Sequence, residues 1–248
     1  MRPASISILG SCSVSVAGEI LPGAPSSLFR IAAFLALSGH SFSASRQRLG
    51  ALLWPDSVAA KSAGNLRQAL SRIRHFQADH NFTLLDGNAA AVFIDASRSV
   101  QFDLLVLLDR LADPAPRAAL DLCTIYAGEF LADLPYSGSE FEDWLALQRA
   151  QVRDRCADRL SAALGETSGL SDTERVTCAQ KLLELDPCNE EAYCCLMLYA
   201  AEHGHRSRIH ALFDSCQRQL MRELGVRPSA RTVHAFQDLL DRLNAMTA

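Results

Sequence analysis

The segment from Lys61 to Phe76 carries side chains whose types and spacing could read DNA. On a helical wheel of about 100° per residue, its apolar residues gather on one side, namely Leu66, Ala69, Leu70, Ile73 and Phe76. The opposite side carries Lys61, Gly64, Asn65, Gln68, Ser71, Arg72 and His75, flanked by Arg67 and Arg74. Arginine pairs bidentately with guanine, asparagine and glutamine pair with adenine, and serine is adaptable. The segment therefore predicts a recognition helix.

A solvated amphipathic helix is the alternative for this segment, because such helices also turn lysine, arginine and glutamine outward. No aspartate or glutamate lies between Ser57 and Ala78. A surface that is only solvated usually mixes charges of both signs. The missing acidic residues therefore favour DNA binding.

The charge distribution also separates the two halves of the chain. Residues 1–101 hold nine basic and five acidic groups, a net charge of +4, although the whole chain carries −4. The remainder therefore carries −8. A basic module joined to an acidic partner domain shows this asymmetry.

A second helix is predicted just before the recognition helix. Ser43 or Ser45 can cap it, its apolar face carries Leu49, Leu52 and Leu53, and Pro55 stops it. In a helix-turn-helix, this helix crosses the DNA backbone. We expect Arg46 and Arg48 to meet phosphates.

The elements around these two helices predict an α+β domain over residues 1–98. Alternating residues in 5–21 predict two or three short strands, and Leu28–Ser38 predicts a helix ended by Gly39. The recognition helix should cover about Ala59–Ala78, and the segments 82–85 and 91–94 should form a hairpin with a type I′ turn at Asp86-Gly87. This order is that of a winged helix with an extra small N-terminal sheet, although other small α+β domains share it.

Residues 99–248 predict an all-helical domain, and no convincing strand occurs from Asp103 onward. Helical periodicity covers about 102–112, 115–127, 139–165, 172–185, 189–203, 206–223 and 229–245. Two weakly similar helical units end near Pro187 and Pro228, 41 residues apart, a longer period than the roughly 34 residues of a tetratricopeptide repeat. Such units stack into a solenoid because none buries its apolar face alone. We therefore expect a tetratricopeptide-like repeat domain.

Other chemistry has little support in the sequence. The eight cysteines form no C-x-x-C pair and no zinc-finger spacing, so we expect most of them to pack as small hydrophobes. His203, His205 and His210 lie in or beside a turn at Gly204, where solvation is the expected role. No phosphate-binding glycine motif or nucleophile elbow occurs. We expect no catalytic residue, metal or cofactor.

Polar and apolar residues alternate near the N-terminus, unlike the continuous apolar run of a signal peptide. No segment is long enough to cross a membrane, so we expect a cytoplasmic, nucleoid-associated protein.

Collinear motifs resemble the Streptomyces antibiotic regulatory protein (SARP) family and its bacterial transcriptional activator domain. In the first half the motifs are Leu49-x-x-Leu52-Leu53-Trp54-Pro55-Asp56 and Asn65-Leu66-Arg67-Gln68-Ala69-Leu70-Ser71-Arg72-Ile73-Arg74. In the second half they are Tyr126-x-Gly128-Glu129-Phe130-Leu131, Glu140-Phe141-Glu142-Asp143-Trp144-Leu145, Leu185-Asp186-Pro187-x-Asn189-Glu190-Glu191-Ala192 and Glu223-Leu224-Gly225-Val226-x-Pro228-Ser229.

The resemblance implies a response-regulator-type winged helix that binds direct repeats in promoters. It also implies a tetratricopeptide-like domain that supports a homodimer or regulation, and recruitment of RNA polymerase holoenzyme by an activator. By match to the family's recognition helix, the DNA-facing residues would be Asn65, Arg67, Gln68, Arg72 and Arg74.

A second function stays open on the sequence. The segment Asp86-Gly87-Asn88-Ala89-Ala90 lacks the arginine or lysine expected to enter the minor groove, and the second half is acidic. The chain could therefore be an adaptor whose helical repeats bind a protein and whose winged helix has lost DNA binding.

Overall fold

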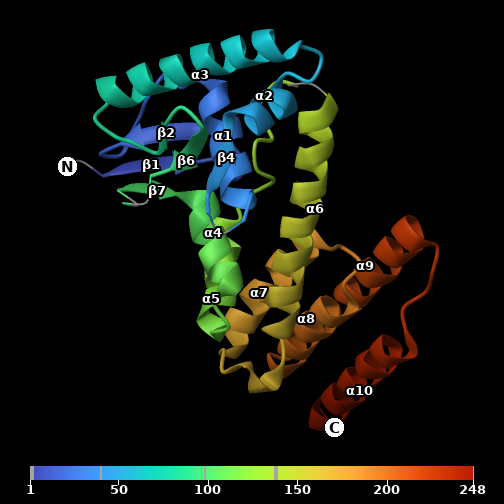
Figure 1. Cartoon of the computed structure of the whole chain (residues 1–248). Coiled ribbons are helices and arrows are strands. Elements are labelled where there is room, and N and C mark those ends of the chain that lie inside the picture. Colours follow the sequence, from blue (N-terminus) through green and yellow to red (C-terminus); the bar gives the residue numbers. More distant parts are fainter. Residues whose placement is uncertain (1–2, 40, 96, 98, 137–138, 248) are drawn as a thin grey trace. The chain divides into compact units, whose positions relative to one another are not determined.

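The computed structural model describes residues 3–39, 41–95, 97, 99–136 and 139–247, and it is a helix-rich α+β structure with two small sheets (Figure 1). The contacts divide the chain into two compact units. The first comprises residues 1–109 and 125–151, and the second comprises residues 110–124 and 152–248. The predicted α+β class is confirmed. The predicted domain boundary follows Arg98, a residue outside the described part, and stays a prediction.

A four-stranded sheet in the first unit contains the strands expected within residues 5–21. Its order is β3-β2-β1-β7, where β1 is Ala4–Ser7, β2 is Ser13–Val16, β3 is Glu19–Ile20 and β7 is Val100–Phe102. Strand β1 pairs antiparallel with β2 and parallel with β7. Ala17 and Gly18 both have positive φ, 53° and 86°, as the tight turn between β2 and β3 requires.

Three helices and a second sheet follow in the first unit. They are α1 (Ser26–Leu37), α2 (Arg46–Leu53) and α3 (Ala59–Asp79), and the sheet has the order β4-β6-β5, with β4 at Ser43–Ser45, β5 at Leu85–Gly87 and β6 at Ala91–Ile94. Leu28, Ile31 and Leu35 of α1 are fully buried. Leu49 of α2 and Leu66, Ala69 and Ile73 of α3 are buried as well, at 1 % exposure or less. Strand β4 was not predicted, and strand β7 lies within residues 99–248, which the sequence predicted to be all helical; for Val100–Phe102 that prediction is wrong.

Residues 125–151 complete the first unit. Leu9 forms a β-bridge with Phe130, and the Asp103 carboxylate, at the start of α4 (Asp103–Ala112), accepts hydrogen bonds from the Ile8 and Leu9 amides at 2.8 and 3.0 Å. Burial raises the pKa of this carboxyl group. The Trp144 ring packs against the Phe34 ring, with centroids 5.1 Å apart. Trp144 is therefore an aromatic packing residue.

The regular elements in the described part of the second unit are all helices, joined by short turns and loops. Its elements are α5 (Pro116–Ile125), the last part of α6 (Ser139–Ala162), the short 3₁₀ helix η1 (Glu166–Ser168), α7 (Asp172–Leu185), α8 (Glu190–Glu202), α9 (Arg206–Leu224) and α10 (Ala230–Thr247). These bounds confirm the predicted helices to within a few residues.

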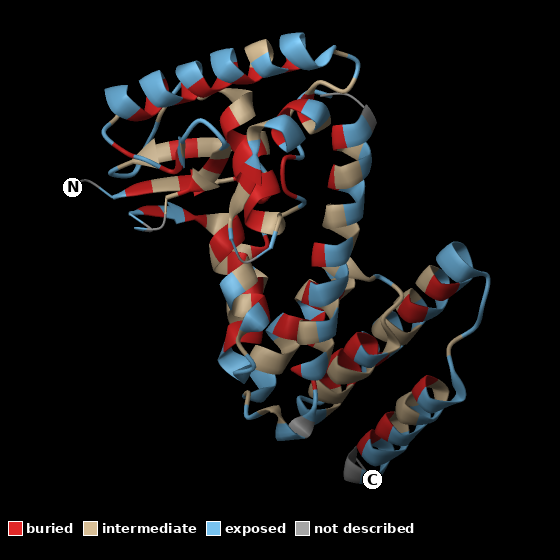
Figure 2. Ribbon diagram, viewed as in Figure 1, coloured by how far each residue is buried: buried red, intermediate tan, exposed pale blue. Residues whose placement is uncertain are grey.

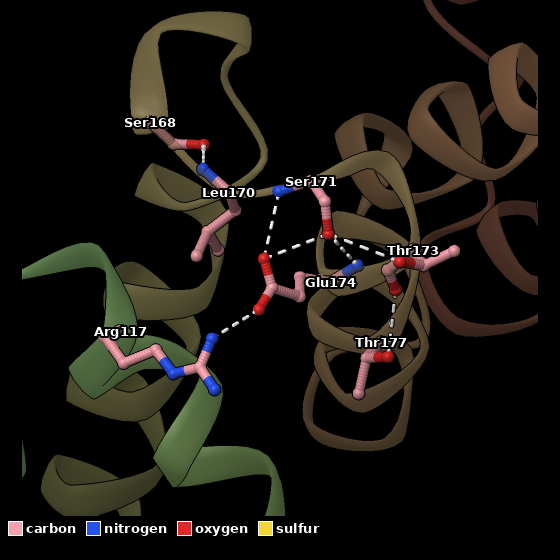
Figure 3. Close-up of polar contacts among 7 residues, drawn as sticks. All are labelled: Arg117, Ser168, Leu170, Ser171, Thr173, Glu174 and Thr177. Atoms are coloured by element: carbon pink, nitrogen blue, oxygen red, sulfur yellow. Dashed lines mark hydrogen bonds and ion pairs between the residues drawn. The ribbon is translucent and has the colours of Figure 1, made fainter.

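Helix α7 begins with a capping box. The Ser171 hydroxyl accepts from the Glu174 amide, and the Glu174 carboxylate accepts from the Ser171 amide (Figure 3). Arg117 of α5 forms an ion pair with the other oxygen of the Glu174 carboxylate. One acidic side chain therefore caps α7 and fastens α5 to it.

No helix in the described part of the chain is long and apolar enough to cross a membrane.

Candidate nucleic-acid interface

Helix α3 presents one buried and one exposed face, as its periodicity predicted (Figure 2). Its buried face includes all five apolar residues singled out in the sequence, namely Leu66, Ala69, Leu70, Ile73 and Phe76. The exposed residues include Lys61, Arg67, Gln68, Ser71, Arg72, Arg74 and His75. Asn65 is half-buried. Packing of the apolar side against α1, α2 and the second sheet thus leaves four cationic side chains on the surface of one helix.

The exposed face of α3 carries no acidic side chain between Ala59 and Ala78 that could neutralise its cations. Helix α3 has no acidic residue in its first turn, and Asp79 is its only acidic residue, at the last position. Among the described residues, no salt bridge joins Lys61, Arg67, Arg72 or Arg74 to a carboxylate. Their charges therefore remain available to an anion.

The start of α2 carries the other two predicted contact residues. Ser45 is its N-cap, and the Ser45 hydroxyl accepts from the Arg48 amide at 3.2 Å. This geometry selects Ser45 from the two caps that the sequence allowed. The Arg48 guanidinium is exposed and lies 5.2 Å from the centre of the Phe34 ring, a cation–π distance.

Arg46 is tied to the turn between β5 and β6. Its Nε donates to the Asn88 carbonyl at 2.7 Å, and its backbone amide donates to the Ala90 carbonyl at 3.0 Å. Three arginines, Arg46, Arg67 and Arg74, and one acidic residue, Glu140, are among the residues that line a cavity of about 930 Å³, together with Trp54 and the Asn88 turn. Helix α2, helix α3 and the β5–β6 turn thus share one cationic surface.

Neither the first strand nor the turn of this hairpin lies where the sequence predicted, because β5 covers Leu85–Gly87 rather than residues 82–85. Asp86 and Gly87 pair with Phe93 and Val92 inside the ladder, so the expected type I′ turn at Asp86-Gly87 is wrong. The chain instead reverses over Asn88–Ala91, where the Asn88 amide donates to the Ala91 carbonyl at 3.0 Å. The Asn88 side-chain oxygen also accepts from the Ala90 and Ala91 amides at 2.9 and 3.0 Å. Asparagine, which favours such local bonds, replaces the Asp-Gly pair as the turn residue.

Gln77 is a buried polar residue that the sequence analysis missed. It is 4 % exposed. Its Oε1 accepts from the Leu84 and Leu85 amides, and its Nε2 donates to the Leu85 carbonyl, each at 2.9 Å. Gln77 therefore fixes α3 against the first strand of the hairpin. Its position four residues after the buried Ile73 is compatible with burial, but the same spacing also fits a solvated glutamine at the edge of the apolar face.

The cysteines were the other candidate ligands considered in the sequence. Cys156, Cys178 and Cys216 are buried, and the remaining five cysteines are half-buried. Among the described residues, no group of three or more His, Cys, Asp or Glu side chains could hold a metal ion.

Comparison with known proteins identifies the family. Residues 109–240 match the family described as the bacterial transcriptional activator domain. The chain belongs to this family. The predicted resemblance to SARP-type regulators is thereby confirmed, and the chain is a member of a family of transcriptional regulators.

One solved structure supports the same fold for the regulator. It is Mycobacterium tuberculosis EmbR in complex with a low-affinity phosphopeptide, which is 13 % identical in sequence and superposes with a TM-score of 0.63. The alignment covers 98 % of the present chain but only 66 % of the EmbR chain. No curated protein matches the sequence.

Proposed function

We propose that this regulator binds promoter DNA through a winged helix formed by α1–α3 and the β5–β6 hairpin. The observation that carries the proposal is the exposed face of α3, which holds Lys61, Arg67 and Arg72 and has no acidic side chain between Ala59 and Ala78. Helix α3 would enter the major groove, where Gln68, Ser71 and Arg72 would contact base edges. Half-buried Asn65 would reach a base only at the rim of this surface.

The remaining cations fit contacts to the DNA backbone. Arg46 and Arg48 lie at the start of α2, which crosses the backbone in helix-turn-helix proteins. The β5–β6 turn carries Asn88, Ala89 and Ala90 and no cation of its own. Arg46, held on the Asn88 carbonyl, would place a positive charge beside this wing.

At the promoter we propose direct repeats as the target, bound by a homodimer or by tandem protomers. The tetratricopeptide-like helices of the second unit would hold the second protomer or RNA polymerase holoenzyme, and the outcome would be activation. This role places the protein on chromosomal DNA in the cytoplasm.

The test is binding of the full chain to DNA from its own upstream region, measured by fluorescence anisotropy at graded salt. About four to eight phosphate contacts per protomer would make log affinity fall with a slope near −0.9 per contact. Arg67→Ala should flatten the slope by about one contact. Arg72→Ala should cost about 1–3 kcal/mol of discrimination between specific and altered sites. Arg208→Ala is the matched control, because this exposed arginine of α9 lies outside the proposed interface. Failure of the wild type to bind any fragment at low salt would refute the proposal.

An adaptor function is the second candidate, and a cavity favours it. The second unit holds a cavity of about 740 Å³ lined by residues of α7, α8 and α10, among them Arg175, Glu191, Tyr199 and Arg231. A peptide partner could occupy this space, which is in the usual size range of ligand sites. Replacing Lys61, Arg67 and Arg72 together by alanine separates the two functions. An adaptor would keep regulating transcript levels in the host, whereas a DNA-binding regulator would lose that effect.

A further inference from the structure

Helices α5 and α7 bring two cysteines together that lie 55 positions apart in the sequence. The Cys123 and Cys178 Sγ atoms are 3.9 Å apart, against about 2.05 Å in a disulfide bond. Both are free thiols, Cys178 is buried, and Cys123 is half-buried. One member of the pair is therefore only partly covered, and the other is buried beside it.

The surrounding packing holds the pair in place. Cys178 belongs to the same apolar cluster as Ala119, Ala179 and Leu182, and Cys123 packs against that cluster. The Arg117–Glu174 ion pair joins the same two helices nearer their N-termini (Figure 3). Both thiols lie on helices that pack against each other, so the 3.9 Å distance between their Sγ atoms is set by the interface between α5 and α7.

The two thiols also differ in acidity in the way a reactive pair requires. The hydrogen bond between them and the nearby charge of Lys181 lower the pKa of Cys123, although partial burial opposes this. The same hydrogen bond and burial raise the pKa of Cys178. The accessible sulfur is thus the better thiolate, and the thiolate is the nucleophilic form.

We propose that Cys123 and Cys178 are an oxidative modification site that closes to a reversible disulfide when the regulator meets a peroxide. The Cys123 thiolate attacks one oxygen of hydrogen peroxide, the O–O bond breaks, and Cys123 becomes a sulfenic acid as hydroxide leaves and takes a proton. Cys178 then attacks the Cys123 sulfur, the S–O bond breaks, and water leaves with the Cys178 proton. Two thiols and one peroxide give one disulfide and two water molecules.

The bond would close a loop that contains α6 and the start of α7. This loop runs from Cys123 to Cys178, and α6 (Ser139–Ala162) contributes residues to both compact units. A covalent link across a loop of this length restricts the unfolded chain. Oxidation should therefore make the helical unit harder to unfold.

The test uses the native full-length chain, treated with an equimolar amount of hydrogen peroxide, blocked with iodoacetamide and digested without reductant. Mass spectrometry should find the Cys123 and Cys178 peptides linked, and dithiothreitol should separate them. Cys123→Ser should abolish the link and is expected to fold, because the side chain is half-buried. Cys178→Ala, which adds no buried polar group, should abolish it as well. Cys188→Ser is the matched control, because half-buried Cys188 contacts the Gln219 carbonyl rather than a second thiol, and it should retain the full yield.

Three outcomes would overturn the proposal. They are over-oxidation of Cys123 without a link, a link that forms only after unfolding in urea, and a link from Cys178 to Cys195. DNA binding by the reduced chain is measured separately. Failure of this modification site would therefore leave the proposed function standing.

Discussion

Replacing Gln77 by leucine tests whether this residue fixes α3 to the hairpin. Leucine keeps a similar size but removes the partner of two amides and one carbonyl, all bonded at 2.9 Å. Each buried polar group left unsatisfied costs about 1–3 kcal/mol. We expect a total loss of about 3–5 kcal/mol, because the hairpin can relax and admit some water.

Urea unfolding followed by tryptophan fluorescence measures the loss of unfolding free energy in the first compact unit. Trp54 and Trp144 are the chain's two tryptophans, and both lie in the first compact unit. With a urea dependence of about 2 kcal/mol per molar, the midpoint should fall by roughly 1.5–2.5 M. Gln68→Leu is the matched control, because Gln68 is exposed on the same helix, and it should shift stability by less than about 0.5 kcal/mol. A loss below about 1 kcal/mol for Gln77→Leu would refute the assignment of these three bonds as the link between helix and hairpin.

Three further predictions follow from single contacts. Gly87→Ala should destabilise the first unit by about 1–3 kcal/mol, because its Cβ would lie 2.8 Å from the Ala91 carbonyl oxygen. Gly64→Ala, whose Cβ would meet only the Arg67 guanidinium at 3.8 Å, should instead stabilise it by about 0.5–1 kcal/mol, and equal effects in urea unfolding would contradict this pair of predictions. Leu66→Ala, at 1 % exposure, should cost about 2–5 kcal/mol, whereas Leu147→Ala, at 56 % exposure, should change the unfolding free energy by less than about 0.5 kcal/mol. The Ser171 hydrogen bonds, aided by Arg117, lower the pKa of Glu174 in the folded chain. The Glu174 carboxylate therefore stabilises the fold above its unfolded pKa of about 4.3, and this stabilisation is lost as the pH falls through its folded pKa. The stability gap between wild type and Glu174→Gln, followed by far-ultraviolet circular dichroism, should therefore narrow from pH 7 to pH 3, and a gap that is constant over this range would contradict the capping role.

Local patterns in the sequence predicted most of the helices and the faces that they bury. The apolar spacing of Leu66, Ala69, Leu70 and Ile73 defined the buried side of α3, because helical periodicity is a property of neighbouring residues. The motifs around Trp54 and Leu185 indicated the family in the same way. Strands β4 and β7 were missed because segments of three residues are too short to show alternation.

The contacts that assemble the candidate site depend instead on which distant residues meet. The sequence placed Asp86-Gly87 at the hairpin turn, but pairing with Val92 and Phe93 keeps both residues in the strand. It placed Arg46 near phosphates, but only folding brings its guanidinium to the Asn88 carbonyl. Helical spacing does not distinguish a buried glutamine with three backbone partners from a solvated one.

By itself, the sequence determined the helices, the cationic face of α3 and membership of the activator family, since each depends on residues within one or two turns of one another or on motifs in order. The tertiary structure decided the turn at Asn88, the burial of Gln77 and the meeting of Cys123 with Cys178. These depend on packing between segments far apart in the chain, and the apolar clusters that bring such segments together form only when the whole unit folds.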